Sequence, residues 1–131
     1  MLLVSPIYIS LLAILIIYLA YRVTTFRRSE NISLGDDNGS KEMKRAVRAH
    51  GNAVENIPAA CILLILLELN SLNPLLLNIF GLLFLLSRIA HAWGLSIKNG
   101  PSFGRFYGTL VSWLTVLTMA FLNIYLVFIK L

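Results

Sequence analysis

The chain alternates long apolar segments with short polar ones, and this alternation predicts its structural elements. Four segments, at roughly 4–23, 43–69, 75–94 and 105–129, are long enough to cross a hydrocarbon core of ~30 Å as α-helices. Residues 24–42 are polar and rich in turn formers, which predicts a solvated loop. We therefore predict a single domain, residues 1–131, that folds as an all-α integral membrane bundle of four transmembrane helices.

Composition and charge support this class of protein. Hydrophobic residues make up 58% of the chain and charged residues only 13%, whereas soluble domains usually carry ~25% charged residues. Of the 11 lysines and arginines, all except Lys130 lie in the first loop, the third loop or the helix ends beside them. The positive-inside rule then predicts cytoplasmic first and third loops and external termini. Because the basic residues flank apolar spans, we expect contact with the lipid bilayer and no nucleic-acid partner.

The residues available argue against several kinds of chemistry. The chain has two histidines and one cysteine, without the spacing of a ligand set, so we expect no metal site. Neither a glycine-rich phosphate loop nor a Ser-His-Asp set is visible. Cys61 lies within an apolar run, where we expect it to pack rather than to react.

The segment 45–58 joins a polar cluster to the start of a membrane-length helix, which is costly unless something binds there. At ~100° per residue, its polar side chains share an arc of roughly 100° while His50 points to the other side. The members of this arc are Arg45, Arg48, Asn52, Glu55 and Asn56. We interpret this face as a binding site; the alternative is a structural set of ion pairs and hydrogen bonds between helices.

Two further helices carry candidate polar residues. Arg88 and His91 lie one turn apart on the third helix, and an arginine about two turns deep in a span requires a partner, for which we expect Glu55 at similar depth. His91 alone could equally be a hydrogen-bonding residue between helices. The fourth helix begins with Arg105 and then aligns small and hydroxyl residues, which indicate close helix packing first and ligand lining second. These residues are Gly108, Thr109, Ser112 and Thr115.

The predicted cytoplasmic helix ends together offer four arginines and one acid. The arginines are Arg22, Arg48, Arg88 and Arg105, and the acid is Glu55. Guanidinium groups hold carboxylates bidentately, so this set suits a small anionic ligand with carboxylates and one ammonium group. Glu55 would then take the ammonium.

The motif Arg48-Ala-His50-x-Asn52-x-x-Glu55-x-x-Pro58 resembles the second-helix signature of the MAPEG family, membrane-associated proteins in eicosanoid and glutathione metabolism. Arg88-x-x-His91 resembles the third-helix motif of that family, and Pro101 followed by Arg105 resembles the start of its fourth helix. The resemblance covers essentially the whole chain, with the motifs in the family's order.

The resemblance implies a homotrimer that binds glutathione between neighbouring protomers near the cytoplasmic surface. Residues carried over to glutathione binding are Arg22, Arg48, Asn52, Glu55, Arg88 and His91. Arg105 matches the family arginine that stabilises the thiolate, which makes it the implied catalytic residue. A thiol with a pKa of ~8.5 is mostly protonated at neutral pH, and a neighbouring cation lowers that pKa. The implied activity is that of a glutathione transferase or peroxidase acting on hydrophobic electrophiles, with a role in detoxification.

The chain also departs from the family pattern. Leu95 stands where many members have a tyrosine, and the third loop is longer between Pro101 and Arg105 than usual. Arg-x-x-His-Ala-Trp-Gly-Leu and Ser-Phe-Gly-Arg-Phe-Tyr-Gly are more similar to the bacterial branch, which implies an inner-membrane location. Tyr107 is a candidate to replace the missing phenol, although it points away from the small-residue face.

Two other functions stay open at this stage. A protein of the same fold could bind lipid or glutathione and assist a partner without catalysis. A small multidrug transporter is a third class, but the first span, 4–21, contains no aspartate or glutamate for proton coupling. The sequence does not distinguish conjugation from peroxide reduction, and it does not identify the electrophile.

Overall fold

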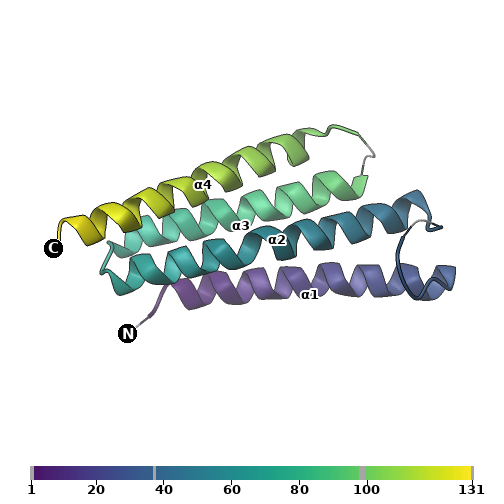
Figure 1. The fold of residues 1–131 in the computed structure, drawn as a ribbon, viewed down its shortest axis with the longest axis horizontal. Coiled ribbons are helices and arrows are strands. Elements are labelled where there is room, and N and C mark those ends of the chain that lie inside the picture. Colours follow the sequence, from purple (N-terminus) through teal and green to yellow (C-terminus); the bar gives the residue numbers. More distant parts are fainter. Residues whose placement is uncertain (1, 37, 98–99, 131) are drawn as a thin grey trace.

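The structure is a computed structural model that describes residues 2–36, 38–97 and 100–130. Within these residues the chain forms four α-helices: α1 (Ser5–Glu30), α2 (Lys41–Leu69), α3 (Pro74–Ile97) and α4 (Phe103–Phe128). Consecutive helices run antiparallel along the length of the molecule (Figure 1). Both termini lie at one end, and the α1–α2 and α3–α4 connections lie at the other, which we call the basic end.

All four helices are long and apolar enough to cross a membrane, which confirms the predicted fold class. Large hydrophobic side chains stay exposed along every helix, as expected where lipid replaces water around a bundle. The helices α2 and α3 form the centre because each contacts all the other helices. By contrast, α1 and α4 do not contact each other over the described residues, so they flank the central pair.

The face that α2 buries is made mainly of small residues at its polar half and of larger ones further along. Its buried hydrophobic residues are Met43, Ala46, Ala49, Ala53, Ile57, Ala60, Leu64 and Leu67. These positions follow the three- and four-residue spacing of one helix face. Alanines allow neighbouring backbones to approach closely, and this brings the polar residues of α2 within reach of α3.

The helix boundaries differ from the predicted ones mainly in α1. This helix continues to Glu30 instead of ending near residue 23, so part of the predicted loop is helical. The segment contains no glycine or proline, and Arg27 and Arg28 in the last turn suit the negative end of the helix dipole. Asn31 ends the helix in a left-handed conformation with φ of 56°. Lys98, which the charge distribution assigns to the same end of the bundle, lies outside the described residues.

Each of the first two helices begins at a carboxylate supplied by the other. Glu68, near the end of α2, accepts the backbone N–H groups of Leu3, Val4 and Ser5 at 2.6, 2.8 and 2.7 Å, where α1 begins. Glu30, at the end of α1, accepts the backbone N–H and the hydroxyl of Ser40, the N-cap residue of α2. Carboxylates at helix starts satisfy backbone N–H groups that have no partner within the helix.

Candidate functional site

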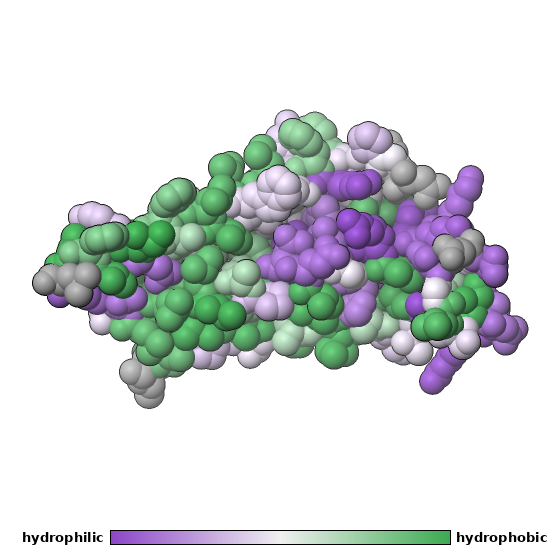
Figure 2. All heavy atoms as spheres, viewed as in Figure 1, coloured by the Kyte–Doolittle hydropathy of each residue, from purple (hydrophilic) through white to green (hydrophobic). Residues whose placement is uncertain are grey.

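Hydrophilic residues gather on the face shown in Figure 2, over the half of the bundle nearer the basic end. Hydrophobic side chains cover most of the other half of that face. The hydrophilic area extends well into the length of the helices, beyond the connections alone. A polar surface that reaches so far along apolar helices is unusual for a membrane protein and marks this face as the candidate site.

The centre of the site is Arg88, whose residue surface is only 2% exposed. Its Nη2 donates a hydrogen bond to Oδ1 of Asn52 on α2, and its Nη1 lies 3.4 Å from Oγ of Ser112 on α4. The arginine therefore links its own helix, α3, to α2 and α4. Its Nε is buried without a hydrogen-bond partner in the described part of the chain.

The predicted Arg88–Glu55 partnership is wrong. The carboxylate of Glu55 instead lies 3.9 Å from Arg48, on its own helix, and the two side chains are 59% and 63% exposed. Glu55 is rotated further from the buried face of α2 than Asn52, so the amide and not the acid meets Arg88. An ion pair that exposed contributes little to stability, which leaves both charges accessible to a ligand.

The remaining polar residues of the predicted α2 face serve local contacts. Asn56 donates to the backbone carbonyl of Asn52, one turn back on the same helix. Arg45 pairs with Glu42 at 2.6 Å and also donates to the carbonyl of Ile97 at the end of α3. Arg45 and Asn56 therefore fit the alternative interpretation, in which the polar residues serve structural ion pairs and hydrogen bonds. Arg48 and Glu55 are not explained by such contacts.

His91 connects α3 to the start of α4. Its Nδ1 lies 3.1 Å from the carbonyl oxygen of Arg105 and 2.9 Å from the hydroxyl of Thr109. Its Nε2 is buried without a partner among the described residues. Arg48, Arg88 and Arg105 all lie close enough to the ring to act on it electrostatically. Cations from α2, α3 and α4 therefore lie in the neighbourhood of His91.

Close packing of α3 against α4 holds this arrangement in place. A Cβ added at Gly108 would lie 2.7 Å from the backbone oxygen of Ser87 and 2.8 Å from the backbone nitrogen of His91. The hydroxyls of Ser87 and Ser112 are 2.7 Å apart and buried between the two helices. The small-residue face of α4 therefore serves packing. Ser87 was not singled out from the sequence, although it directly precedes Arg88.

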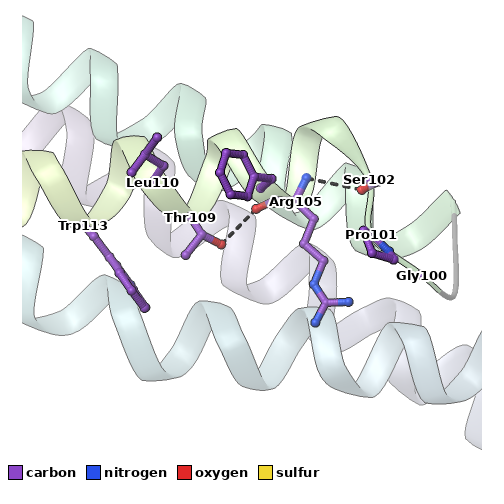
Figure 3. A pocket seen from close by; sticks show the side chains of 8 residues that line it. Gly100, Pro101, Ser102, Arg105, Thr109, Leu110 and Trp113 are labelled. Atoms are coloured by element: carbon purple, nitrogen blue, oxygen red, sulfur yellow. Dashed lines mark hydrogen bonds between the residues drawn. The ribbon is translucent and has the colours of Figure 1, made fainter.

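Arg105 lies beside a groove of about 510 Å³ on α4 and the segment before it. The side chains of Phe106, Leu110 and Trp113 line the apolar part of the groove. Figure 3 shows the Arg105 side chain extending away from α4. The backbone N–H of Arg105 donates a hydrogen bond of 3.3 Å to the hydroxyl oxygen of Ser102, the N-cap residue. The guanidinium is exposed and makes no hydrogen bond within the described residues, so it is free to meet a ligand.

Two other candidates lie apart from this centre. Arg22 donates to the hydroxyl of Ser96 on α3 at 2.6 Å, and its helix does not reach α4 in the described structure. Tyr107 stacks against Phe103, with ring centroids 4.3 Å apart, on the exposed side of α4. One chain therefore assembles Arg48, Asn52, Glu55, Arg88, His91 and Arg105 and leaves Arg22 on the α1 side. No group of three metal-ligating residues occurs among the residues that the structure describes.

The fold and the site together define a multi-pass, all-α membrane protein with an arginine-rich centre at one end of its bundle. A sequence model of the MAPEG family matches residues 5–125, and the chain belongs to this family. It is 31% identical over 122 residues to the inner membrane protein YecN of Escherichia coli strain K12, across 93% of this chain and 91% of YecN. The YecN of Escherichia coli O6:H1 strain CFT073 matches to the same extent. The predicted family is thereby confirmed.

Proposed function

We propose that the protein is a glutathione-dependent transferase or peroxidase that acts on hydrophobic electrophiles at the bacterial inner membrane. The observation that carries this proposal is that Arg48, Arg88 and Arg105, from three helices, all lie near His91, with the carboxylate of Glu55 3.9 Å from Arg48. Glutathione carries two carboxylates, one ammonium group and one thiol. Such a ligand needs several cations, one anion and a group that stabilises a thiolate.

The residues of the site divide these tasks. Arg48 is exposed and can form a bidentate contact with a ligand carboxylate, while Glu55 offers its carboxylate to the ammonium group. Asn52 accepts a hydrogen bond from Nη2 of Arg88 and so holds the arginine in place. Its effect on the ligand is therefore indirect, through the position of Arg88. His91 fixes the start of α4 through the carbonyl of Arg105 and thereby helps to set the position of that residue.

Arg105 is the proposed catalytic residue. Its exposed guanidinium can lie beside the sulfur and stabilise the thiolate, which is the nucleophilic form of the thiol. The adjoining groove, lined by Phe106, Leu110 and Trp113, gives an electrophile dissolved in the bilayer a route to the sulfur. In conjugation the sulfur forms a bond to the electrophilic carbon, and the leaving group departs with the bonding electrons.

The site also favours an assembly of several copies, for which the family implies a homotrimer. Glu55 stands midway between Lys41 and Leu69 on α2, and more than half of its side chain is exposed. A charged residue so far along a membrane helix is costly against lipid, so a second copy is expected to cover this face. Arg22, which lies on α1, would then complete the site of a neighbouring copy. The basic end would face the cytoplasm, as the charge distribution predicts.

A second candidate function is binding without catalysis. It is favoured by Leu95, which is buried and apolar where many family members carry a tyrosine, and by the outward stack of Tyr107 on Phe103. A member without a working thiolate site could still hold glutathione or a lipid through Arg48 and Glu55. The two functions differ in whether bound glutathione ionises.

The test compares ionisation, turnover and binding in the purified protein. With glutathione added, thiolate absorbance and conjugation of a chlorodinitrobenzene-type electrophile should both appear. Arg105→Ala should lower turnover by about 10²-fold or more, in line with loss of a residue that stabilises developing charge, while glutathione still binds. Lys41→Ala, which removes an exposed cation from the same end, is the matched control and should keep the activity. Unchanged turnover in Arg105→Ala would refute the role of that residue, and bound glutathione without thiolate would favour binding alone.

A further inference from the structure

A second cluster of basic residues lies at the end of α1, apart from the proposed glutathione site around Arg88. A cavity of about 460 Å³ is formed where α1 meets its connection to α2. It is lined by Thr24, Arg27, Arg28, Asn31, Ile32 and Ser33. Two guanidinium groups, two hydroxyls and one amide therefore surround one open space. Carboxylates are absent from this lining.

The two arginines of the cavity are not neutralised by the protein. Neither Arg27 nor Arg28 forms a salt bridge within the described residues, and Nη1 of Arg27 is buried without a hydrogen-bond partner there. The nearest acid along the chain, Glu30, is engaged with Ser40. A guanidinium group that the protein leaves without a carboxylate carries an uncompensated charge, and an anion in the cavity would balance it.

The position of the cavity relative to a membrane indicates which anion can occupy it. At 1.5 Å per residue, Arg27 lies about 33 Å along α1 from Ser5. The hydrocarbon core is ~30 Å thick, and the headgroup layers extend the bilayer to ~40–45 Å. If α1 enters the core near its first residue, Arg27 and Arg28 therefore lie at the level of the lipid phosphates. Figure 1 shows the ends of α1 and α2 reaching beyond α3 and α4 at the basic end, so the cavity is not covered by those helices.

We propose that this cavity is a binding site for the headgroup of an anionic phospholipid, with the phosphate held by Arg27 and Arg28. Guanidinium groups bind phosphate oxygens in a bidentate fork, and the Ser33 hydroxyl and the Asn31 amide can donate to the remaining oxygens, whereas the Thr24 hydroxyl already donates to the carbonyl of Ala20. Net negative headgroups are favoured over zwitterionic ones because the lining offers two cations and no acid to hold a choline group. The site is independent of the proposed glutathione chemistry, since it shares no residue with it.

The test measures lipid selectivity in the full-length protein. The protein is reconstituted in phosphatidylcholine vesicles that contain spin-labelled phosphatidylglycerol or spin-labelled phosphatidylcholine, and the motionally restricted fraction of each label gives its relative association constant. The wild type should prefer phosphatidylglycerol. Removing surface cations weakens attraction to anionic lipid about fivefold per charge, so Arg27→Gln/Arg28→Gln should lose most of the preference.

Three comparisons make the result decisive. Lys41→Gln/Lys44→Gln removes the same charge from the start of α2 and should keep most of the preference. Arg27→Lys/Arg28→Lys keeps the charge but loses the fork, and should fall between the wild type and the glutamine variant. Equal losses in the arginine and lysine pairs would overturn the proposal in favour of diffuse surface charge. Removal of the preference by millimolar inorganic phosphate at constant ionic strength would also overturn it, because free phosphate would then be the better occupant.

Discussion

Replacing Asn52 with alanine tests how strongly the buried arginine depends on its neighbour. Arg88 is 2% exposed, and Asn52 supplies the acceptor for its Nη2. A hydrogen bond to a charged group contributes about 1.5–3 kcal/mol, and a buried donor that loses its partner keeps its desolvation cost. The Nη1 contact to Ser112 is long, at 3.4 Å, and offers little compensation. We therefore expect Asn52→Ala to lower the free energy of unfolding by about 2–3 kcal/mol.

The matched control is Asn56→Ala, one turn further along the same helix. The Asn56 amide donates only to a backbone carbonyl of its own helix, so its loss should cost less than about 1 kcal/mol. Both variants are unfolded in detergent micelles without glutathione, and helix content is followed by circular dichroism. A double-mutant cycle with Arg88→Met then isolates the pair, because the apolar replacement removes the charge that needed an acceptor. Equal losses in the two alanine variants, or no coupling between Asn52 and Arg88, would refute this account.

Two further substitutions test the packing and the helix starts. Gly108→Ala should destabilise the protein by about 1–3 kcal/mol, because its Cβ would meet backbone atoms of α3 that cannot move aside. Gly51→Ala is the control, because Gly51 is also in a helix but has no described atom within 4 Å of the new Cβ; this change should be neutral or stabilising by up to ~1 kcal/mol. Both variants are compared by thermal unfolding, and equal effects of the two substitutions would contradict the packing argument. Glu68→Gln should lower unfolding free energy by about 1–2 kcal/mol, because an amide is a weaker acceptor for the N–H groups at the start of α1. Glu42→Gln, which breaks only an exposed contact to Arg45, should change it by less than ~0.5 kcal/mol in the same experiment.

The fold could be predicted from the sequence because four apolar segments have few alternatives in a membrane. Helical periodicity also placed Arg48, Asn52 and Glu55 on one side of α2. The prediction ends α1 too early because polarity indicates a loop at Arg27 and Arg28, although these arginines also suit the last turn of a helix. Polarity alone does not separate a solvated helix end from a loop.

The contacts of the site were harder to predict than its members. Periodicity gives the direction of a side chain on its own helix, but not the rotation of the helix that faces it. The choice of Asn52 over Glu55 as the partner of Arg88 depends on that rotation. The separation of Arg22 from Arg105 depends on which helices touch, and the sequence contains no direct signal for that. Glu68 was not singled out because its partners are backbone groups at the far end of the chain.

The contacts in which α1 and α2 each supply a carboxylate to the start of the other limit how this pair of helices can change during evolution. Glu68 determines where α1 starts, and Glu30 with Ser40 determines where α2 starts. Inserting a residue within either helix would move one carboxylate by 1.5 Å and ~100° away from the N–H groups that it serves. The intervening connection can gain or lose residues without this effect. We therefore expect related chains to vary in length between Asn31 and Gly39 while the lengths of the two helices change only together.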